Sequence, residues 1–391
     1  MIDLFAFSQL RTAARRRRVL ALWLALWGLG LGLSASATSA RAAEHLYITN
    51  TGSFNISAFT INLDGSLTAV PGSPFPVGTF PGTSILDSKH RFLYTPAGSP
   101  TAVWGFHINT DGSLTPVPGS PFPAPTQATG VGAAVSERRG DFLYLTNSNN
   151  TISVYSISLV DGSLTLLPTL SVPTGNSPGR TIVDPTGRFL YVAILNPDNS
   201  NGIDSYRIHP GSGGLKLIHS SPFASGMGGA ALAIDPSGRF LYATNFTDND
   251  VSGFIVLRNG GLVSIASSPF ATEPNPDTVT VDPKDRFVYV GNGALPGFVP
   301  IGISAFTLNL ANGFLTTVPG SPFPSPSPTI GDVHDLAVDP SGQFLYVSLF
   351  TESTANIAGY TINSDGSLTP LSGSPFIQAG IAPSGVNVTP F

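Results

Sequence analysis

The sequence predicts an all-β chain folded as a seven-bladed β-propeller with four-stranded antiparallel blades. A short apolar segment containing Tyr recurs seven times, at steps of 47 to 57 residues. A repeat of about 40 to 50 residues built only of short strands is typical of a propeller with one blade per repeat. No helical pattern of about 12 residues interrupts the repeats. The recurring tyrosines are Tyr47, Tyr94, Tyr144, Tyr191, Tyr242, Tyr289 and Tyr346.

The first strand of each repeat, strand a, is predicted from an apolar run that ends near Asp-Pro, as at 181–185, 233–236, 279–283 and 337–340. Gly187, Gly238 and Gly342 then turn the chain into the Tyr segment, which is strand b. Asp, Pro and Gly each favour such a turn for a different backbone reason.

Strand c is predicted about ten residues after the Tyr, where polar and apolar residues alternate with period two. It covers 56–59, 103–106, 152–155, 203–206, 251–254, 303–306 and 357–360. The tight turn Asp-Gly-Ser-Leu-Thr then leads into strand d at 64–68, 111–115, 161–165 and 365–369. Six repeats close with Ser-Pro-Phe, whose Phe we expect to fill the space between neighbouring blades.

The two ends of the repeat region do not coincide with whole blades. The first repeat starts at strand b, residues 45–50, and the chain ends with an isolated strand a, residues 385–389. Seven complete blades therefore require the last strand to complete the first blade. Closing the ring in this way protects sheet edges that would otherwise pair with other chains.

Composition agrees with one folded domain at residues 43–391. Only 10% of the 391 residues are charged, whereas 43 are Gly and 35 are Pro, and the chain has no Cys. Residues 1–42 have the order of a secretory signal peptide, with Arg15–Arg18, an apolar run at 19–33 and Ala40-Arg41-Ala42. We expect export to the periplasm or the extracellular space, by the general secretory or the twin-arginine route, without a lasting membrane anchor.

The chain without residues 1–42 has 12 basic and 22 acidic residues, a formal charge of −10. Nucleic acid is disfavoured as a partner because phosphate binding needs a basic surface. The six histidines are scattered, and motifs for a P-loop, a dinucleotide, a nucleophilic Ser or a zinc protease are missing from the sequence. We expect no metal and no cofactor, and we expect a monomer.

Candidate site residues are those that depart from the repeat in the loops around one end of the channel. Arg180 stands where other blades have Thr, Ala or Gly; His334 and Asp335 precede strand a of blade 7, and Glu352 lies in the following b–c loop. Arg180, His334 and Asp335 could bind an anionic or lactone ligand, and Arg180, His334 and Glu352 could perform acid–base chemistry. Acidic residues also gather in blades 5 to 7, which could hold a cation: Asp248, Asp250, Glu273, Asp277 and Asp332.

The Asp-Pro-Ser-Gly-Arg-Phe-Leu-Tyr element at 235–242 resembles the lactonase-type seven-bladed propellers. The segments at 47–50, 144–147 and 242–245 resemble the YVTN repeats of their surface and periplasmic relatives. The resemblance covers nearly all of residues 45–391 and implies the propeller fold. Its enzymes, the 6-phosphogluconolactonases and carboxymuconate cyclases, carry His and Arg before inner strands and a Glu after a b strand.

Arg180, His334 and Glu352 stand near those family positions, with two departures. Gly179-Arg180 replaces the Arg-His of the family's Pro-Arg-His motif, and Glu352 is displaced by about two residues. Two functions remain open. The chain is expected to be an exported module that binds a small sugar acid, a lactone or a protein partner. The alternative is a lactonase-type hydrolase, or a related lactone cyclase or isomerase, in the same fold.

Overall fold

The computed structural model describes residues 43–99, 101–125, 132–135, 142–195, 201–228, 231–293, 302–325, 332–350, 356–377 and 380–389. Across these ranges the regular elements are β-strands, apart from one turn of 3-10 helix at Pro168–Leu170. The same ranges contain no helix that is both long and apolar enough to cross a membrane. The prediction of an all-β chain is confirmed.

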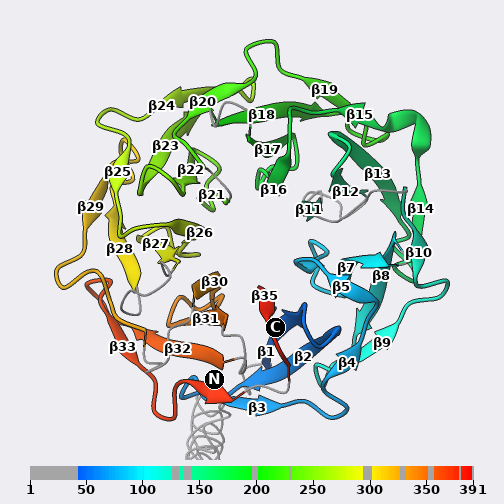
Figure 1. Cartoon of the computed structure of the whole chain (residues 1–391), viewed down its shortest axis with the longest axis horizontal. Helices are drawn as coiled ribbons and strands as arrows, with labels where there is room; N and C mark the ends of the chain where they lie inside the picture. Colours follow the sequence, from blue (N-terminus) through cyan, green and yellow to red (C-terminus); the bar gives the residue numbers. More distant parts are fainter. Residues whose placement is uncertain are drawn as a thin grey trace, which may run out of the picture. The chain divides into compact units, whose positions relative to one another are not determined.

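Seven antiparallel sheets, one per repeat, are arranged in a ring within residues Ala43–Phe391 (Figure 1). Strand a of each sheet lies nearest the centre. In blades 1 to 7 the a strands are β35 (Pro383–Thr389), β5 (Thr79–Pro81) with β6 (Ile85–Leu86), β11 (Gly132–Val135), β16 (Pro178–Val183), β21 (Leu232–Ile234), β26 (Pro276–Val281) and β30 (Asp332–Val338).

The remaining strands follow outward from the centre in the predicted order. The b strands are β1 (Glu44–Asn50), β7 (Phe92–Ser99), β12 (Phe142–Asn147), β17 (Phe189–Leu195), β22 (Phe240–Asn245), β27 (Phe287–Asn292) and β31 (Phe344–Phe350). The c strands are β2 (Asn55–Ile61), β8 (Thr101–Ile108), β13 (Thr151–Ile157), β18 (Asn201–Ile208), β23 (Asp250–Val256), β28 (Ile303–Leu308) and β32 (Asn356–Ile362). The d strands are β3 (Leu67–Ala69), β9 (Leu114–Pro116), β14 (Leu164–Leu166), β19 (Leu215–Leu217), β24 (Leu262–Ser264), β29 (Leu315–Thr317) and β33 (Leu368–Pro370).

The outermost part of a blade differs from the single d strand that the sequence suggested. After the d strand, the chain turns and a second short strand pairs with the beginning of strand c. In blade 1, β3 pairs with the end of β2, and β4 (Phe75–Pro76) pairs with its beginning. The Ser of the Ser-Pro-Phe motif lies in the turn, where Ser73 Oγ accepts a hydrogen bond from the Ala58 N–H at 2.9 Å. Its hydroxyl thus replaces the backbone acceptor that the interrupted strand cannot supply.

The second outer strands of the other blades are β10 (Phe122–Pro123), β15 (Val172–Pro173), β20 (Phe223–Ser225), β25 (Phe270–Ala271) and β34 (Phe376–Ile377). Blade 6 has a single bridge between Ile303 and Phe323 at this place. The Ser-Pro bond of all six Ser-Pro-Phe motifs is cis.

The last strand closes the ring as predicted. Strand β35 pairs antiparallel with β1, with Ile48 opposite Val386 and His45 opposite Thr389. The first blade is therefore built from both ends of the propeller, and both edges of β1 are paired because β2 occupies the other one. This closure removes the exposed edge that an open ring would leave.

The apolar core lies between the blades. It forms seven clusters in the described residues, and each cluster joins two neighbouring blades. In one of them, Phe270 of blade 5 packs with Val290 and Phe306 of blade 6. All six Phe side chains of the Ser-Pro-Phe motifs belong to such clusters. The interpretation of this motif as inter-blade packing is confirmed, at about 1.5–3 kcal/mol for each Phe fully buried.

The Tyr of strand b and the Gly of the outer turn are repeated motifs that contact each other between adjacent blades. The hydroxyl of Tyr346 in blade 7 donates to the carbonyl of Gly65 in blade 1 at 2.7 Å. Gly65 has a φ of +82°, and a Cβ on it would lie 2.7 Å from the ring of Phe344. Glycine is thus required twice, by its backbone conformation and by the Phe ring against it. The same Tyr-to-Gly bond links five further pairs, from Tyr47, Tyr94, Tyr144, Tyr242 and Tyr289.

Candidate functional site

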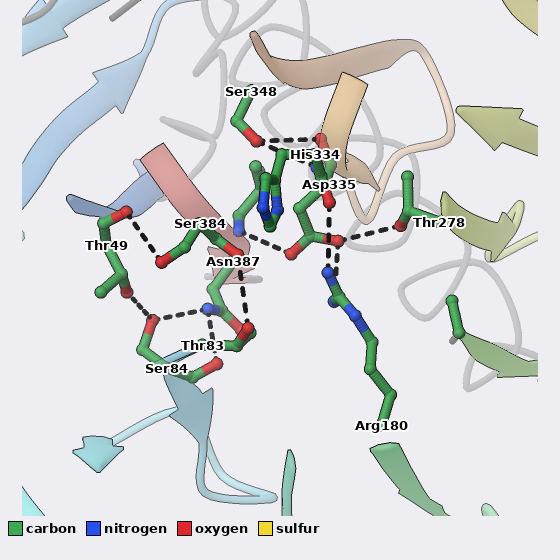
Figure 2. Close-up of polar contacts among 12 residues, drawn as sticks. Thr49, Thr83, Ser84, Arg180, Thr278, His334, Asp335, Ser348, Ser384 and Asn387 are labelled. Atoms are coloured by element: carbon green, nitrogen blue, oxygen red, sulfur yellow. Dashed lines mark hydrogen bonds and ion pairs between the residues drawn. The ribbon is translucent and has the colours of Figure 1, made fainter. Parts of the chain in front are cut away.

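An ion pair connects two distant blades near the centre of the ring. Arg180 lies on β16 of blade 4 and Asp335 on β30 of blade 7, 155 positions apart in the sequence (Figure 2). Arg180 Nη1 donates to Asp335 Oδ1 at 3.0 Å, and Nη2 donates to the backbone carbonyl of His334 at 3.2 Å. The two contacts fix the orientation of the planar guanidinium, whose rigid fork suits such paired acceptors.

The ion pair is largely removed from solvent. The side chain of Asp335 is 8% exposed and that of Arg180 is 25% exposed. A buried charge is costly unless it is paired and hydrogen-bonded, and these two charges satisfy both conditions. A quarter of the Arg180 side chain nevertheless remains exposed.

Asp335 also holds two further blades. Its Oδ1 accepts a second hydrogen bond from Thr278 Oγ1 of blade 6 at 3.0 Å, and its Oδ2 accepts from the Val386 N–H of blade 1 at 2.9 Å. Its own backbone N–H donates to Ser348 Oγ at 3.0 Å. One carboxylate therefore connects blades 1, 4, 6 and 7, and we call Arg180, Thr278, Asp335 and Val386 the central brace.

Local backbone irregularities bring these side chains to the centre. The pairing of β16 with β17 shifts register between Pro178 and Thr181, and that of β30 with β31 shifts between Val333 and Asp335. A β-bulge of this kind adds a residue to one strand and changes the direction of the side chains beside it. Arg180 and His334 are bulge residues, which explains why both depart from the apolar pattern of strand a.

A second polar group lies beside the brace, at the junction of blades 1 and 2 (Figure 2). Thr49 Oγ1 donates to Ser84 Oγ at 2.8 Å, and Asn387 Nδ2 donates to the same Ser84 Oγ at 2.9 Å. Thr83 Oγ1 donates to the carbonyl of Ser384 at 3.3 Å. Thr49 and Ser84 are buried, so this network stabilises the junction where the ring closes.

The structure brings some of the predicted site residues together and does not describe another. Arg180 lies within β16, and His334 and Asp335 lie within β30, not in the loops where the sequence placed them. The three residues are brought together, with Arg180 reaching across the ring axis. The His334 side chain is half-buried, and its contact with Arg180 is made by its backbone carbonyl. Glu352 lies outside the described residues. A shared catalytic role for Arg180, His334 and Glu352 stays a prediction.

The predicted acidic group is distributed over several local contacts. Asp248 Oδ2 accepts from the Met227 N–H, and Asp250 Oδ1 accepts from Asn245 Nδ2, each at 2.6 Å. Burial raises the pKa of Asp250, an effect that its bond from Asn245 partly offsets. In the part of the chain that the structure describes, no group of three or more His, Asp or Glu side chains is arranged to hold a metal ion.

Two members of the central brace, Thr278 and Val386, do not depart from the repeat in the sequence. Thr278 stands in an ordinary strand a, where a Thr is expected as readily as an apolar residue. Val386 contributes only its backbone N–H, for which a side-chain pattern gives no signal. Asp335 departs from the repeat together with His334, but its position in the sequence does not indicate its contacts with three other blades.

The family model described as "Lactonase, 7-bladed beta-propeller" matches residues 36–226 and 219–330. No curated protein matches the chain.

Similar solved structures include a Bacteroides uniformis protein provisionally named as a 6-phosphogluconolactonase, with 19% identity and a TM-score of 0.69, covering 89% of this chain and 100% of that one. The periplasmic gluconolactonase of Pseudomonas aeruginosa has 16% identity and a TM-score of 0.67, covering 89% of this chain and 99% of that one. At such identities the structures share the fold, while the family match covers most of the sequence. The chain belongs to the family of lactonase-type seven-bladed β-propellers.

Proposed function

We propose that the centre of the ring binds a small sugar acid or its lactone, with Arg180 as the contact for the carboxylate or the lactone carbonyl. The observation that carries this proposal is the position of Arg180. Its side chain extends across the ring axis, its guanidinium is held by Asp335 and the His334 carbonyl, and one quarter of the side chain remains exposed. A fixed, partly exposed arginine side chain binds a carboxylate with little loss of side-chain entropy on binding.

The charge balance favours a ligand with one negative charge or none. Asp335 already neutralises Arg180, and residues 43–391 carry a formal charge of −10. A phosphorylated sugar acid would bring up to three negative charges to a centre whose only described ion pair is neutral, and the surrounding negative charge would oppose it. We therefore propose an unphosphorylated polyhydroxy acid or lactone as the ligand class.

The binding experiment uses purified residues 43–391 and titration calorimetry with gluconate and 6-phosphogluconate. Gluconate should bind, and 6-phosphogluconate should bind more weakly. Arg180→Met should weaken gluconate binding by roughly tenfold or more, the loss expected for a hydrogen-bonded charge pair. Arg258→Gln is the matched control, because Arg258 lies exposed in an outer turn. A parent protein that binds neither compound contradicts the proposal.

Hydrolysis of the lactone is the second candidate function, favoured by the family match and by His334 beside Arg180. We propose that His334 takes a proton from water as the water oxygen bonds to the lactone carbonyl carbon, since histidine is the side chain that most often acts as a general base. Arg180 would stabilise the negative carbonyl oxygen, and the ring oxygen would leave with a proton. Glu352 would orient His334 or supply that proton.

A panel of sugar lactones with the parent protein and His334→Ala tests the hydrolysis. If the chain is a lactonase, the parent accelerates ring opening above the spontaneous rate, and His334→Ala lowers this by about 100-fold or more. His209→Ala is the control, because His209 lies exposed in an outer turn. Gluconate binding without any acceleration would leave the binding function and reject the enzymatic one.

Export is proposed together with this function, from residues 1–42. The exported protein should begin near Ala43, and replacement of Arg15–Arg18 by Gln should leave precursor in the cytoplasm. N-terminal sequencing of the secreted form decides the first point, and fractionation decides the second. An intact N-terminus in a membrane fraction would show instead that the segment is an anchor.

A further inference from the structure

Within the described residues, four inner strands carry a register shift at the same height of the ring. The shifts lie in β16, β26, β30 and β35, and each is opposite the second or third residue after the Tyr of strand b. These are the strands of blades 4, 6, 7 and 1, the same four that the central brace connects. Bulges are over-represented next to functional sites because they re-aim side chains.

Each shift lies at a polar residue. Asp277 is the additional residue in β26, His334 in β30 and Ser384 in β35, while Arg180 belongs to the shift in β16. Strands β26, β30 and β35 are consecutive neighbours around the ring. Asp277, His334 and Ser384 thus form an arc over three adjacent blades, and Arg180 reaches this arc from the other side.

The exposed parts of these side chains can face only the ring axis or its open end. Both faces of an inner strand pack against neighbouring blades, and its outer edge pairs with strand b. Asp277, His334 and Ser384 are nevertheless all half-buried and not fully enclosed. Figure 2 shows Ser384 and His334 on the same side of Asp335, with Ser384 Oγ donating to the Thr49 carbonyl at a long 3.4 Å.

The central brace holds the arc in place. Asp335 follows His334, Thr278 follows Asp277, and Val386 lies two residues after Ser384. The Asp335 carboxylate binds Thr278 and Val386 directly, at 3.0 and 2.9 Å. Each bulge is therefore fixed by a hydrogen bond one or two residues away, which gives the arc the rigidity that a selective site requires.

We propose that Asp277 and Ser384 determine specificity for the hydroxyl groups of the ligand. The inference rests on the proposed function, in which Arg180 binds the acid or carbonyl end. A carboxylate can accept hydrogen bonds from two neighbouring hydroxyls, and a serine hydroxyl can both donate and accept. A polyhydroxylated chain held at one end by Arg180 would present its hydroxyls to the arc, whereas an aliphatic acid would offer Asp277 and Ser384 no hydrogen bond.

The test compares gluconate with hexanoate, two six-carbon monocarboxylates that differ in their hydroxyls. Calorimetry gives the ratio of their affinities for the parent protein and for the variants. Asp277→Asn should reduce the preference for gluconate by about tenfold, the value of a hydrogen bond to a charged group, and Ser384→Ala by about threefold. Hexanoate should bind Asp277→Asn as well as the parent or slightly better, because a negative charge has been removed.

The controls separate specificity from stability and from the proposed function. Asp248→Asn removes a carboxylate from a loop at the same end of the ring and should leave the ratio unchanged. Arg180→Met should weaken both acids together. If Asp277→Asn and Ser384→Ala keep the parent ratio, or lose both acids equally, the inference is wrong while the binding function stands. If the parent binds neither acid, the proposed function itself fails.

Discussion

Replacing Asp335 by alanine should destabilise the ring through the loss of the central brace. The change leaves the Arg180 guanidinium without its counter-ion and removes the acceptor of Thr278 Oγ1 and the Val386 N–H. Removal of one partner from a buried ion pair costs about 3–5 kcal/mol. Because a quarter of the Arg180 side chain is exposed and can be hydrated, we expect a loss of about 2–4 kcal/mol in the free energy of unfolding.

Calorimetry of residues 43–391 measures this loss as a change in melting temperature. With about 2.1 cal/mol/K of unfolding entropy per residue, a domain of this length has about 0.7 kcal/mol/K, so a loss of ~3 kcal/mol lowers the melting temperature by about 4 °C. Asp365→Asn, in an exposed outer turn, is the control and should leave the melting temperature unchanged.

A double-mutant cycle identifies the ion pair as the cause. Arg180→Met alone leaves Asp335 with its bonds from Thr278 and Val386 but without its counter-ion. Arg180→Met combined with Asp335→Ala leaves no unpaired charge, so the double variant should be more stable than the sum of the single changes by about 1–3 kcal/mol. A coupling near zero, or a loss below about 1 kcal/mol for Asp335→Ala, would refute the brace as a stabilising element.

Three further predictions concern the ring itself. Deletion of residues 384–391 should lower the melting temperature sharply, because blade 1 loses its inner strand; an unchanged temperature would reject the closure. Tyr346→Phe should lower the free energy of unfolding by about 1 kcal/mol, because it removes a buried hydrogen bond. Tyr191→Phe should cost less, because Ser205 Oγ donates to the glycine carbonyl that corresponds to the Tyr acceptor in other blades. Equal losses in urea denaturation would contradict this. Burial lowers the pKa of His45, so its stabilising effect is present above pH 6.5 and is lost as the pH falls below that value. His45→Phe, which introduces the residue type of the other blades, should remove this part of the acid destabilisation. An unchanged dependence of stability on pH would exclude a role of His45 in it.

The repeated motifs could be interpreted correctly because their partners repeat as well. The Tyr of strand b, the Gly of the outer turn and the Phe of Ser-Pro-Phe meet the same neighbours at most blade junctions. The division of the outer strand was not predicted. The sequence shows the Ser and Pro that interrupt it, but the pairing of the following Phe with strand c depends on a turn whose direction the pattern does not give.

The candidate site was predictable only in part. Arg180 and His334 were found because they break the repeat, and the bulges that carry them produce this break. Their meeting depends on the curvature of the ring, which brings blade 4 opposite blade 7. Thr278 and Val386 gave no signal, since one conforms to the strand pattern and the other acts through its backbone.

The sequence by itself determined the fold class, the number of blades, the place of strands b and c and the closure of the ring. These features follow from local spacing and from packing between sequence-adjacent repeats, and the motifs that produce them recur in most repeats. The tertiary structure alone decided that Asp335 joins four blades and that Asp277, His334 and Ser384 lie on one arc. The bond from Arg180 to Asp335 crosses the ring axis, and the bonds from Thr278 and Val386 join neighbouring blades; none of them belongs to the repeated pattern, so the spacing of the motifs carries no signal for them.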